Sequence, residues 1–225
     1  MMKSRILAIT GLLAFLLASP RQSDAVPLLL SGDNGLEGLG SFEGTLTYTP
    51  STATLVISLT NTSPAANGGF LTAFALNNPD DKITGISLSA TDTDFGLLGT
   101  APFNGDDVDA QPFGHYDFGA SNTSDWLGGG SPTNAIGVGQ TATFTFSLTG
   151  TTLNTLTEES FVGELPSGME GECCDEFMVV RFRGFDDEGS DKVPTDFTPI
   201  PEPSALFLLG VGMVGIVLWR RRQAS

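Results

Sequence analysis

Apolar and polar side chains alternate through much of the chain between residues 26 and 197. In segment 54–60 the apolar side chains of Leu55, Ile57 and Leu59 are separated by hydroxyl residues and Val56, and segment 143–149 alternates in the same way. A period of two indicates a strand with one buried face. Similar patterns predict strands at Phe42–Tyr48, Phe70–Leu76, Ile83–Leu88, Phe113–Phe118 and Phe177–Phe185.

Turn signals separate these predicted strands. They occur at Ser63-Pro64, Asn67-Gly68-Gly69, Asn78-Pro79-Asp80, Asn104-Gly105 and 128–132, and they combine residues that favour tight turns. No part of the body repeats apolar residues at three-four spacing over a length that predicts a long helix. About 170 residues with about seven to ten short strands predict an all-β domain, a single antiparallel β-sandwich of jelly-roll or Ig-like type over residues 26–197. A closed barrel is the alternative.

The first 25 residues have the order of a signal peptide. Lys3 and Arg5 precede an apolar run over 6–18, and a polar stretch ends at Ser23-Asp24-Ala25. Signal peptidase accepts small residues at the third and first positions before the cut, so we expect cleavage after Ala25, with Ala18 as the alternative. The apolar run is short for a membrane span, which disfavours an uncleaved anchor.

The other end, residues 198–225, predicts a transmembrane helix. Ala205–Trp219 contains no polar side chain and is followed by Arg220, Arg221 and Arg222. As a helix this run would be about 23 Å long, and neighbouring residues can complete the span. The arginines should stay on the cytoplasmic side, with Trp219 at the interface, which places the acidic body outside the inner membrane.

The same terminal segment resembles a known sorting signal. Pro201-Glu202-Pro203, the apolar run and the arginine cluster are similar, in this order, to the PEP-CTERM signal of Gram-negative bacteria. The resemblance implies that an exosortase recognises Pro201, Glu202 and Pro203 and that the host makes extracellular polysaccharide. Segments 69–79, 181–185 and 189–193 also resemble a recurrent group of PEP-CTERM precursors. An ordinary tail anchor without processing is the alternative.

The charge of the body narrows the choice of partners. Between residues 26 and 200 four Lys and Arg stand against 24 Asp and Glu, a formal charge of −20. Such a surface repels phosphate backbones, so we expect no nucleic-acid partner. The same charge attracts divalent cations where the geometry allows.

Three acidic loops stand out, one of them with Asp92 and Asp94, and the other two supply the candidate calcium residues. One contains Asp106, Asp107 and Asp109, and the other contains Asp186, Asp187 and Asp191. Calcium takes six to eight oxygen ligands, which such loops can supply. Neither loop matches an EF-hand, and plain solvated surface loops are the alternative. We expect no other cofactor.

The remaining reactive side chains favour no catalytic centre. His115 is the single histidine, and in a strand Asp117 would lie about 6.5 Å from it, beyond a direct hydrogen bond. Cys173 and Cys174 are adjacent and lie among carboxylates. Nearby carboxylates raise the pKa of a thiol, so both cysteines are expected to be poor nucleophiles. A strained vicinal or intermolecular disulfide is an open alternative to an incidental role.

These observations together predict an exported, non-enzymatic bacterial protein. We expect signal peptidase and an exosortase to process an inner-membrane precursor, which then reaches the cell surface or extracellular matrix as a structural or adhesive component of the exopolysaccharide layer. Extracellular polysaccharide is therefore a candidate partner. The alternative is a carbohydrate-active enzyme on the same scaffold, which would need two carboxylates about 5 to 9.5 Å apart in an aromatic-lined groove.

Overall fold

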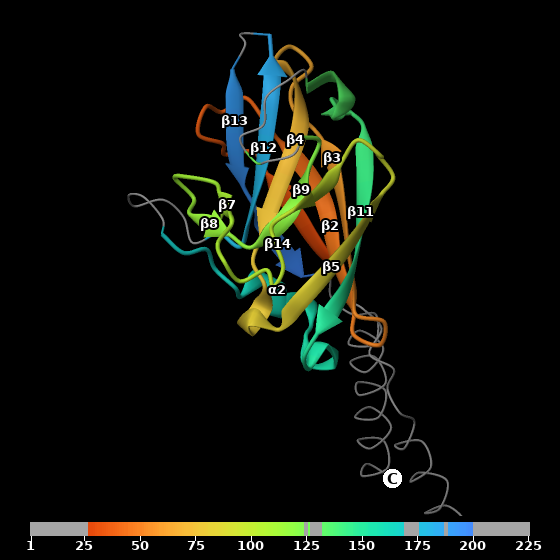
Figure 1. Ribbon diagram of the computed structural model, residues 1–225. Coiled ribbons are helices and arrows are strands. Elements are labelled where there is room, and N and C mark those ends of the chain that lie inside the picture. The colour runs from red at the N-terminus through yellow and green to blue at the C-terminus, as the bar shows by residue number, and fades with distance from the viewer. Residues whose placement is uncertain (1–26, 124–125, 127–131, 169–175, 187–188, 200–225) are drawn as a thin grey trace, which may run out of the picture.

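The structure is a computed structural model that describes residues 27–123, 126, 132–168, 176–186 and 189–199. Most of this part of the chain forms two antiparallel sheets (Figure 1). Sheet A consists, in spatial order, of β14 (Asp196–Pro199), β1 (Leu28–Gly32), β2 (Phe42–Thr49), β3 (Thr54–Asn61), β11 (Thr141–Gly150) and β5 (Ile83–Ala90). Sheet B consists of β13 (Ser190–Pro194), β12 (Met178–Phe185), β4 (Gly68–Leu76), β9 (Phe118–Ser121) and β6 (Gly96–Leu98), and β10 (Ile136–Gly137) also pairs with β4.

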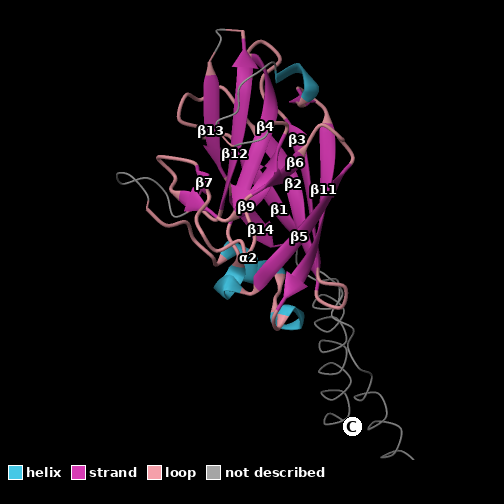
Figure 2. Ribbon diagram, in the orientation of Figure 1, coloured by secondary structure: helices cyan, strands magenta, loops and turns pink. Residues whose placement is uncertain are grey.

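The other elements are short and lie in the connections. Strands dominate the described residues, and helices occupy only small segments at the upper and lower ends of the body (Figure 2). The remaining elements are the hairpin of β7 (Val108–Asp109) and β8 (His115–Tyr116), the 3-10 turns η1 (Pro79–Asp81), η2 (Pro132–Asn134) and η3 (Leu153–Thr155), and α2 (Glu158–Val162).

The prediction of an all-β chain with antiparallel strands is confirmed. Alternation in β3 buries Leu55, Ile57 and Leu59 completely and leaves the intervening residues half-buried. β11 follows the same rule, with Phe144 and Phe146 buried. The period of two thus predicted both the element type and the face that enters the core.

The inner faces of the two sheets share one hydrophobic core. Phe74 of β4 meets Phe144 of β11 with ring centroids 4.8 Å apart, and Phe118 of β9 lies 5.7 Å from Phe146. These rings meet edge to face, a geometry worth about 0.5 to 1.5 kcal/mol beyond burial. Aromatic contacts across the sheets therefore fix their relative position.

Both sheets have open edges within the described ranges. Sheet A ends at β14 and β5, and sheet B ends at β13 and β6. The described strands thus differ from the closed barrel considered as an alternative. They also form more separate segments than the predicted seven to ten, because the chain between β5 and β11 is divided into several strands of two to four residues.

A second, smaller apolar cluster covers the outer face of sheet B. Phe113, Tyr116 and Trp126 pack with Ala73 of β4 and Val179 of β12. This packing explains a wrong prediction: the segment Phe113–Phe118 is not one strand but turns, β8 and the start of β9. Its aromatic residues alternate along the sequence, yet some of them cover the outside of sheet B while Phe118 enters the main core.

The side chains of Arg181 and Lys192 bind the segment that covers the outer face of sheet B. Arg181 donates a hydrogen bond to the Trp126 carbonyl, and Lys192 donates one to the Gln111 carbonyl. Arg181 and Lys192 lie opposite each other in the β12–β13 ladder. Burial lowers the pKa of Lys192 below its ordinary value, and repulsion from Arg181 lowers it further.

The predicted turn at Asn67-Gly68-Gly69 is also partly wrong. Gly68 and Gly69 are the first residues of β4 and both have positive φ. The Phe185 ring lies so close to Gly69 that an added Cβ would approach it to 2.4 Å. Here glycine serves the close approach of a strand and a ring rather than a turn.

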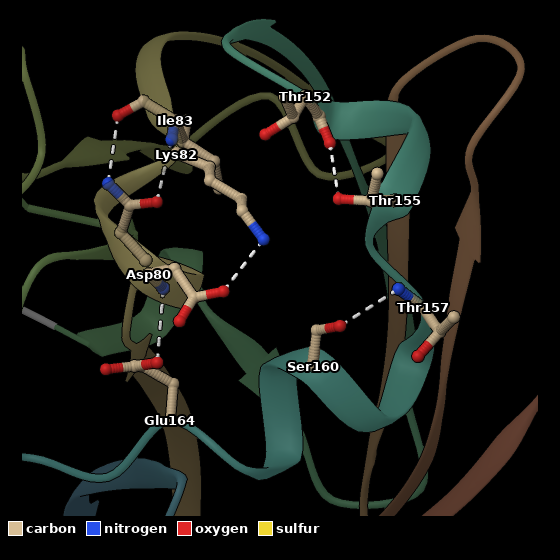
Figure 3. A network of polar contacts seen from close by, with 9 residues as sticks. Asp80, Lys82, Ile83, Thr152, Thr155, Thr157, Ser160 and Glu164 are labelled. Carbon is tan, nitrogen blue, oxygen red and sulfur yellow. Dashed lines mark hydrogen bonds and ion pairs between the residues drawn. The ribbon is translucent and has the colours of Figure 1, made fainter.

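The short helix α2 closes one end of the molecule. Its first turn is fixed by a hydrogen bond from the Thr157 amide to the Ser160 hydroxyl, 3.1 Å long (Figure 3). The buried Glu158 accepts a 3.0 Å hydrogen bond from the Tyr48 amide, and Phe161 packs 5.3 Å from the Tyr48 ring. α2 therefore joins the loop after β11 to the end of β2.

Candidate functional site

The outer face of sheet A is lined by hydroxyl side chains. The alternation that sends leucine and phenylalanine into the core sends threonine and serine outward on three adjacent strands, β2, β3 and β11. We call this surface the hydroxyl face; its members are Thr45, Thr47, Ser58, Thr60, Thr141, Thr143, Thr145, Ser147 and Thr149, with Val56 among them.

The strand register places these hydroxyls in rows across the sheet. Ser58 of β3 lies opposite Thr45 on one side and opposite Thr143 on the other. The Thr143 hydroxyl lies 3.3 Å from the Ser58 hydroxyl, and in the next row the Thr60 and Thr141 hydroxyls lie 2.7 Å apart. Within a row, neighbouring strands are about 4.8 Å apart, so the face presents a regular two-dimensional array.

A hollow of about 500 Å³ lies over the β1–β2–β3 side of this face. Its polar side chains include those of Ser31, Glu43, Thr45, Ser58 and Thr60, and Thr198 of β14 completes the set. Leu29, 46% exposed, supplies an apolar surface beside them. The hollow thus offers hydroxyls that both donate and accept, together with the single carboxylate of Glu43.

A second cavity of about 240 Å³ has a different character. It is lined by Asp33, Asn34, Leu36, Phe113, Glu176, Pro194 and Asp196. Three carboxylates and one aromatic ring therefore line a cavity between the segment after β1, the segment that covers sheet B, and β14. None of these carboxylates belongs to the predicted site residues, because three segments far apart in sequence supply them.

The predicted calcium residues that the structure describes accept hydrogen bonds from neighbouring segments. The Asp106 carboxylate accepts a 2.8 Å hydrogen bond from Ser167, and Asp107 accepts one of 2.9 Å from the Thr100 amide. Asp109 accepts a 3.3 Å bond from the Gln111 amide. Among the residues that the structure describes, no three or more His, Cys, Asp or Glu side chains gather where they could hold a metal ion. Asp187 lies outside those residues.

Asp191, from the second predicted calcium loop, is buried and accepts hydrogen bonds from four backbone amides. Its carboxylate accepts hydrogen bonds from the amides of Glu37, Leu39 and Gly40, at 2.8 to 3.0 Å, and from the amide of Lys192 at 2.8 Å. These bonds hold the segment between β1 and β2 against β13. Asp186 lies elsewhere, at the end of β12, where its amide donates to the Asn67 carbonyl.

Asp117 likewise has a structural environment. It is buried between β8 and β9, and its carboxylate accepts hydrogen bonds from the amides of Asn78, at 3.0 Å, and Asp106, at 3.3 Å. Burial raises the pKa of Asp117 above its ordinary value, although the two amide bonds oppose this shift. Through these two bonds, Asp117 holds the loops that contain Asn78 and Asp106. His115 pairs through its backbone with Ser167.

The predicted processing and membrane residues lie outside the described residues. These are Ala25, Pro201, Glu202, Pro203, Ala205, Trp219, Arg220, Arg221 and Arg222, and Cys173 and Cys174 are outside them as well. Within the described ranges, no helix is long and apolar enough to cross a membrane.

Comparison with known proteins identifies a sorting motif in the C-terminal segment. The described body is an antiparallel all-β structure that ends at Pro199 with β14. A family described as the PEP-CTERM protein-sorting motif matches residues 199–222. The chain therefore carries the sorting motif that the resemblance predicted, which implies an exported protein with a C-terminal membrane-anchoring signal for processing by an exosortase. Neither a curated protein nor a solved structure matches the chain.

Proposed function

We propose that this protein is a non-catalytic, adhesive component of an extracellular polysaccharide layer and that it binds neutral polysaccharide on the hydroxyl face. The observation that carries this proposal is the hollow over β1, β2 and β3, with its hydroxyls arranged in register. The sorting motif supports export, since it implies delivery by an exosortase.

The chemistry of the face suits a neutral sugar polymer. Threonine and serine hydroxyls can donate to and accept from sugar hydroxyls, and Leu29 and Val56 can contact the apolar faces of sugar rings. A repeating array can follow a repeating polymer, so many weak contacts add up. Uronic acid polymers are disfavoured because the body carries a formal charge of −20.

We also propose that the two sheets constitute a β-sandwich of jelly-roll rather than Ig-like type. The support is the path of the chain: the connections β3–β4, β4–β5 and β5–β6 each pass from one sheet to the other. Repeated crossing between two packed sheets is typical of jelly rolls.

The binding proposal is tested by removing hydroxyls without disturbing the core. We expect the double substitution Thr45→Ala and Thr143→Ala to weaken cosedimentation with a neutral insoluble glucan at least about fivefold, since two hydrogen bonds of about 0.5 to 1.5 kcal/mol each are lost. The matched control is Thr52→Ala with Thr151→Ala, which removes two exposed hydroxyls outside the array. Equal weakening in both variants, or no glucan binding by the native protein, would contradict the proposal.

A carbohydrate-active enzyme is the second candidate because of the cavity lined by Asp33, Glu176 and Asp196. Glycoside hydrolysis uses a pair of carboxylates, one as acid and the other as base or nucleophile. This candidate predicts release of reducing sugar from a glucan or xylan, with losses of at least about a hundredfold in Glu176→Gln or Asp196→Asn. Binding without sugar release, unaffected by these substitutions, favours the adhesive function.

A further inference from the structure

The edge of sheet A at β5 lacks the features that usually protect a sheet edge. β5 is eight residues long, and residues 83–91 contain neither charge nor proline. The other edges are protected: β13 contains Asp191, Lys192 and Pro194, β14 contains Asp196 and Pro199, and β6 has three residues. Natural proteins shield edges by charge, proline or shortness, so a long neutral edge indicates a strand that pairs.

The ladder with β11 defines which groups of β5 point outward. Thr91 donates a 3.0 Å hydrogen bond to the Thr143 carbonyl, and the register then pairs Ser89 with Thr145 and Ser87 with Ser147. In an antiparallel ladder, every second residue directs its amide and carbonyl to the same neighbouring strand, and the residues between direct theirs to the other side. The amides and carbonyls of Ile86 and Leu88 therefore point to the edge, where an added strand would find them.

We propose that β5 pairs antiparallel with β5 of a second copy of this chain, with Ser87 opposite Ser87 of the second copy. A two-fold axis through this point makes the contact self-complementary. Residues directly opposite each other in an antiparallel pair share a face, so this register sets Ile86 opposite Leu88 on the core side. On the outer side hydroxyl residues and Gly85 meet.

The absence of charge along β5 favours a second copy at this edge. Lys82 precedes the strand and Asp92 follows it by two residues, so the register places Lys82 of each copy opposite Asp92 of the other. The body otherwise repels its own copies through its formal charge of −20. Both ends of β5 are acidic overall, with Asp80 and Asp81 beside Lys82 and with Asp94 beside Asp92, so two copies approach with least repulsion along the uncharged residues 83–91.

The start of β5 is held in place before any partner arrives. Asn78 donates to the Ile83 carbonyl at 2.9 Å and accepts from the Ile83 amide at 2.8 Å. Figure 3 shows Lys82 reaching Asp80, with 2.7 Å between Nζ and the carboxylate, while the Asp80 amide donates to Glu164. Pairing therefore requires little ordering of this end.

The inferred contact would join two copies of sheet A edge to edge. Because Ser87 lies in the row of Ser147, the hydroxyl faces of the two copies would continue into each other. The inference does not rest on polysaccharide binding, since it follows from the β5 edge alone, and it is tested without any sugar.

Site-directed cross-linking tests the register. The full chain in detergent micelles, with Cys173→Ser and Cys174→Ser, carries either Ser87→Cys or the matched control Ser147→Cys, two exposed serines opposite each other in adjacent strands. A short bis-maleimide should convert most of the Ser87→Cys protein to a covalent dimer linked between the two copies of residue 87, and little of the control. Equal cross-linking of both variants would overturn the proposed register.

Repulsion at the same position tests the association itself. Light scattering of the full chain in micelles, with the micelle mass subtracted, should give a dimer for the native chain and Ser147→Lys. It should give a monomer for Ser87→Lys, because two lysines then face each other. Circular dichroism shows whether each variant is folded. A native monomer at all concentrations, or a folded Ser87→Lys dimer, would overturn the proposal.

Discussion

Leu28 and Pro199 lie opposite each other at the end of the β1–β14 ladder. β1 starts at this point and β14 ends there, so the described body begins and finishes at one place. The two ends of the described body are therefore adjacent at one end of sheet A.

The sorting tripeptide is the first target for mutation, because it lies within the matched sorting motif. Replacing Pro201, Glu202 and Pro203 with alanine should leave the precursor in the membrane fraction and abolish the mass change seen when the exosortase is present. The physical reason is that two prolines keep the tripeptide extended around one carboxylate. Intact-mass analysis measures the outcome, and Ser204→Ala is the control. If the triple mutant matures like the native chain, the tail acts only as an anchor.

Asp191 should contribute strongly to stability. Asp191→Asn keeps the size of the side chain but leaves one acceptor oxygen in place of two, so two of the four backbone amides lose their partner. We expect a loss of about 2 to 4 kcal/mol in the free energy of unfolding, measured in urea. The exposed Asp94→Asn provides the control. A loss no greater than that of Asp94→Asn would show that these amides find other partners.

Asp117 should give the stability a dependence on pH. Because burial raises its pKa in the folded state, the folded protein binds this proton more readily than the unfolded chain does. The contribution to stability is full below the unfolded pKa and is lost as the pH rises through the folded pKa. Urea unfolding between about pH 7 and about pH 4 should therefore show that Asp117→Asn gains less on acidification than the native protein. Parallel curves for the two proteins would contradict this assignment.

The strands with the clearest alternation could be predicted from sequence, since a period of two is a local property. Leu55, Ile57 and Phe144 are buried as predicted, because each strand needs only one apolar face to join a core. The sorting motif was equally local, with its tripeptide, apolar run and arginines consecutive in the chain.

The tertiary structure alone decided which polar residues share a surface. Asp191 resembles a calcium ligand in its acidic loop, yet packing turns its carboxylate toward the amides of residues more than 150 positions away. Ser58 meets Thr45 and Thr143 only because β3 pairs with both β2 and β11 in a definite register. Periodicity determines which way a side chain points, whereas the order of strands in the sheet determines its neighbours, and that order depends on contacts between segments far apart in sequence.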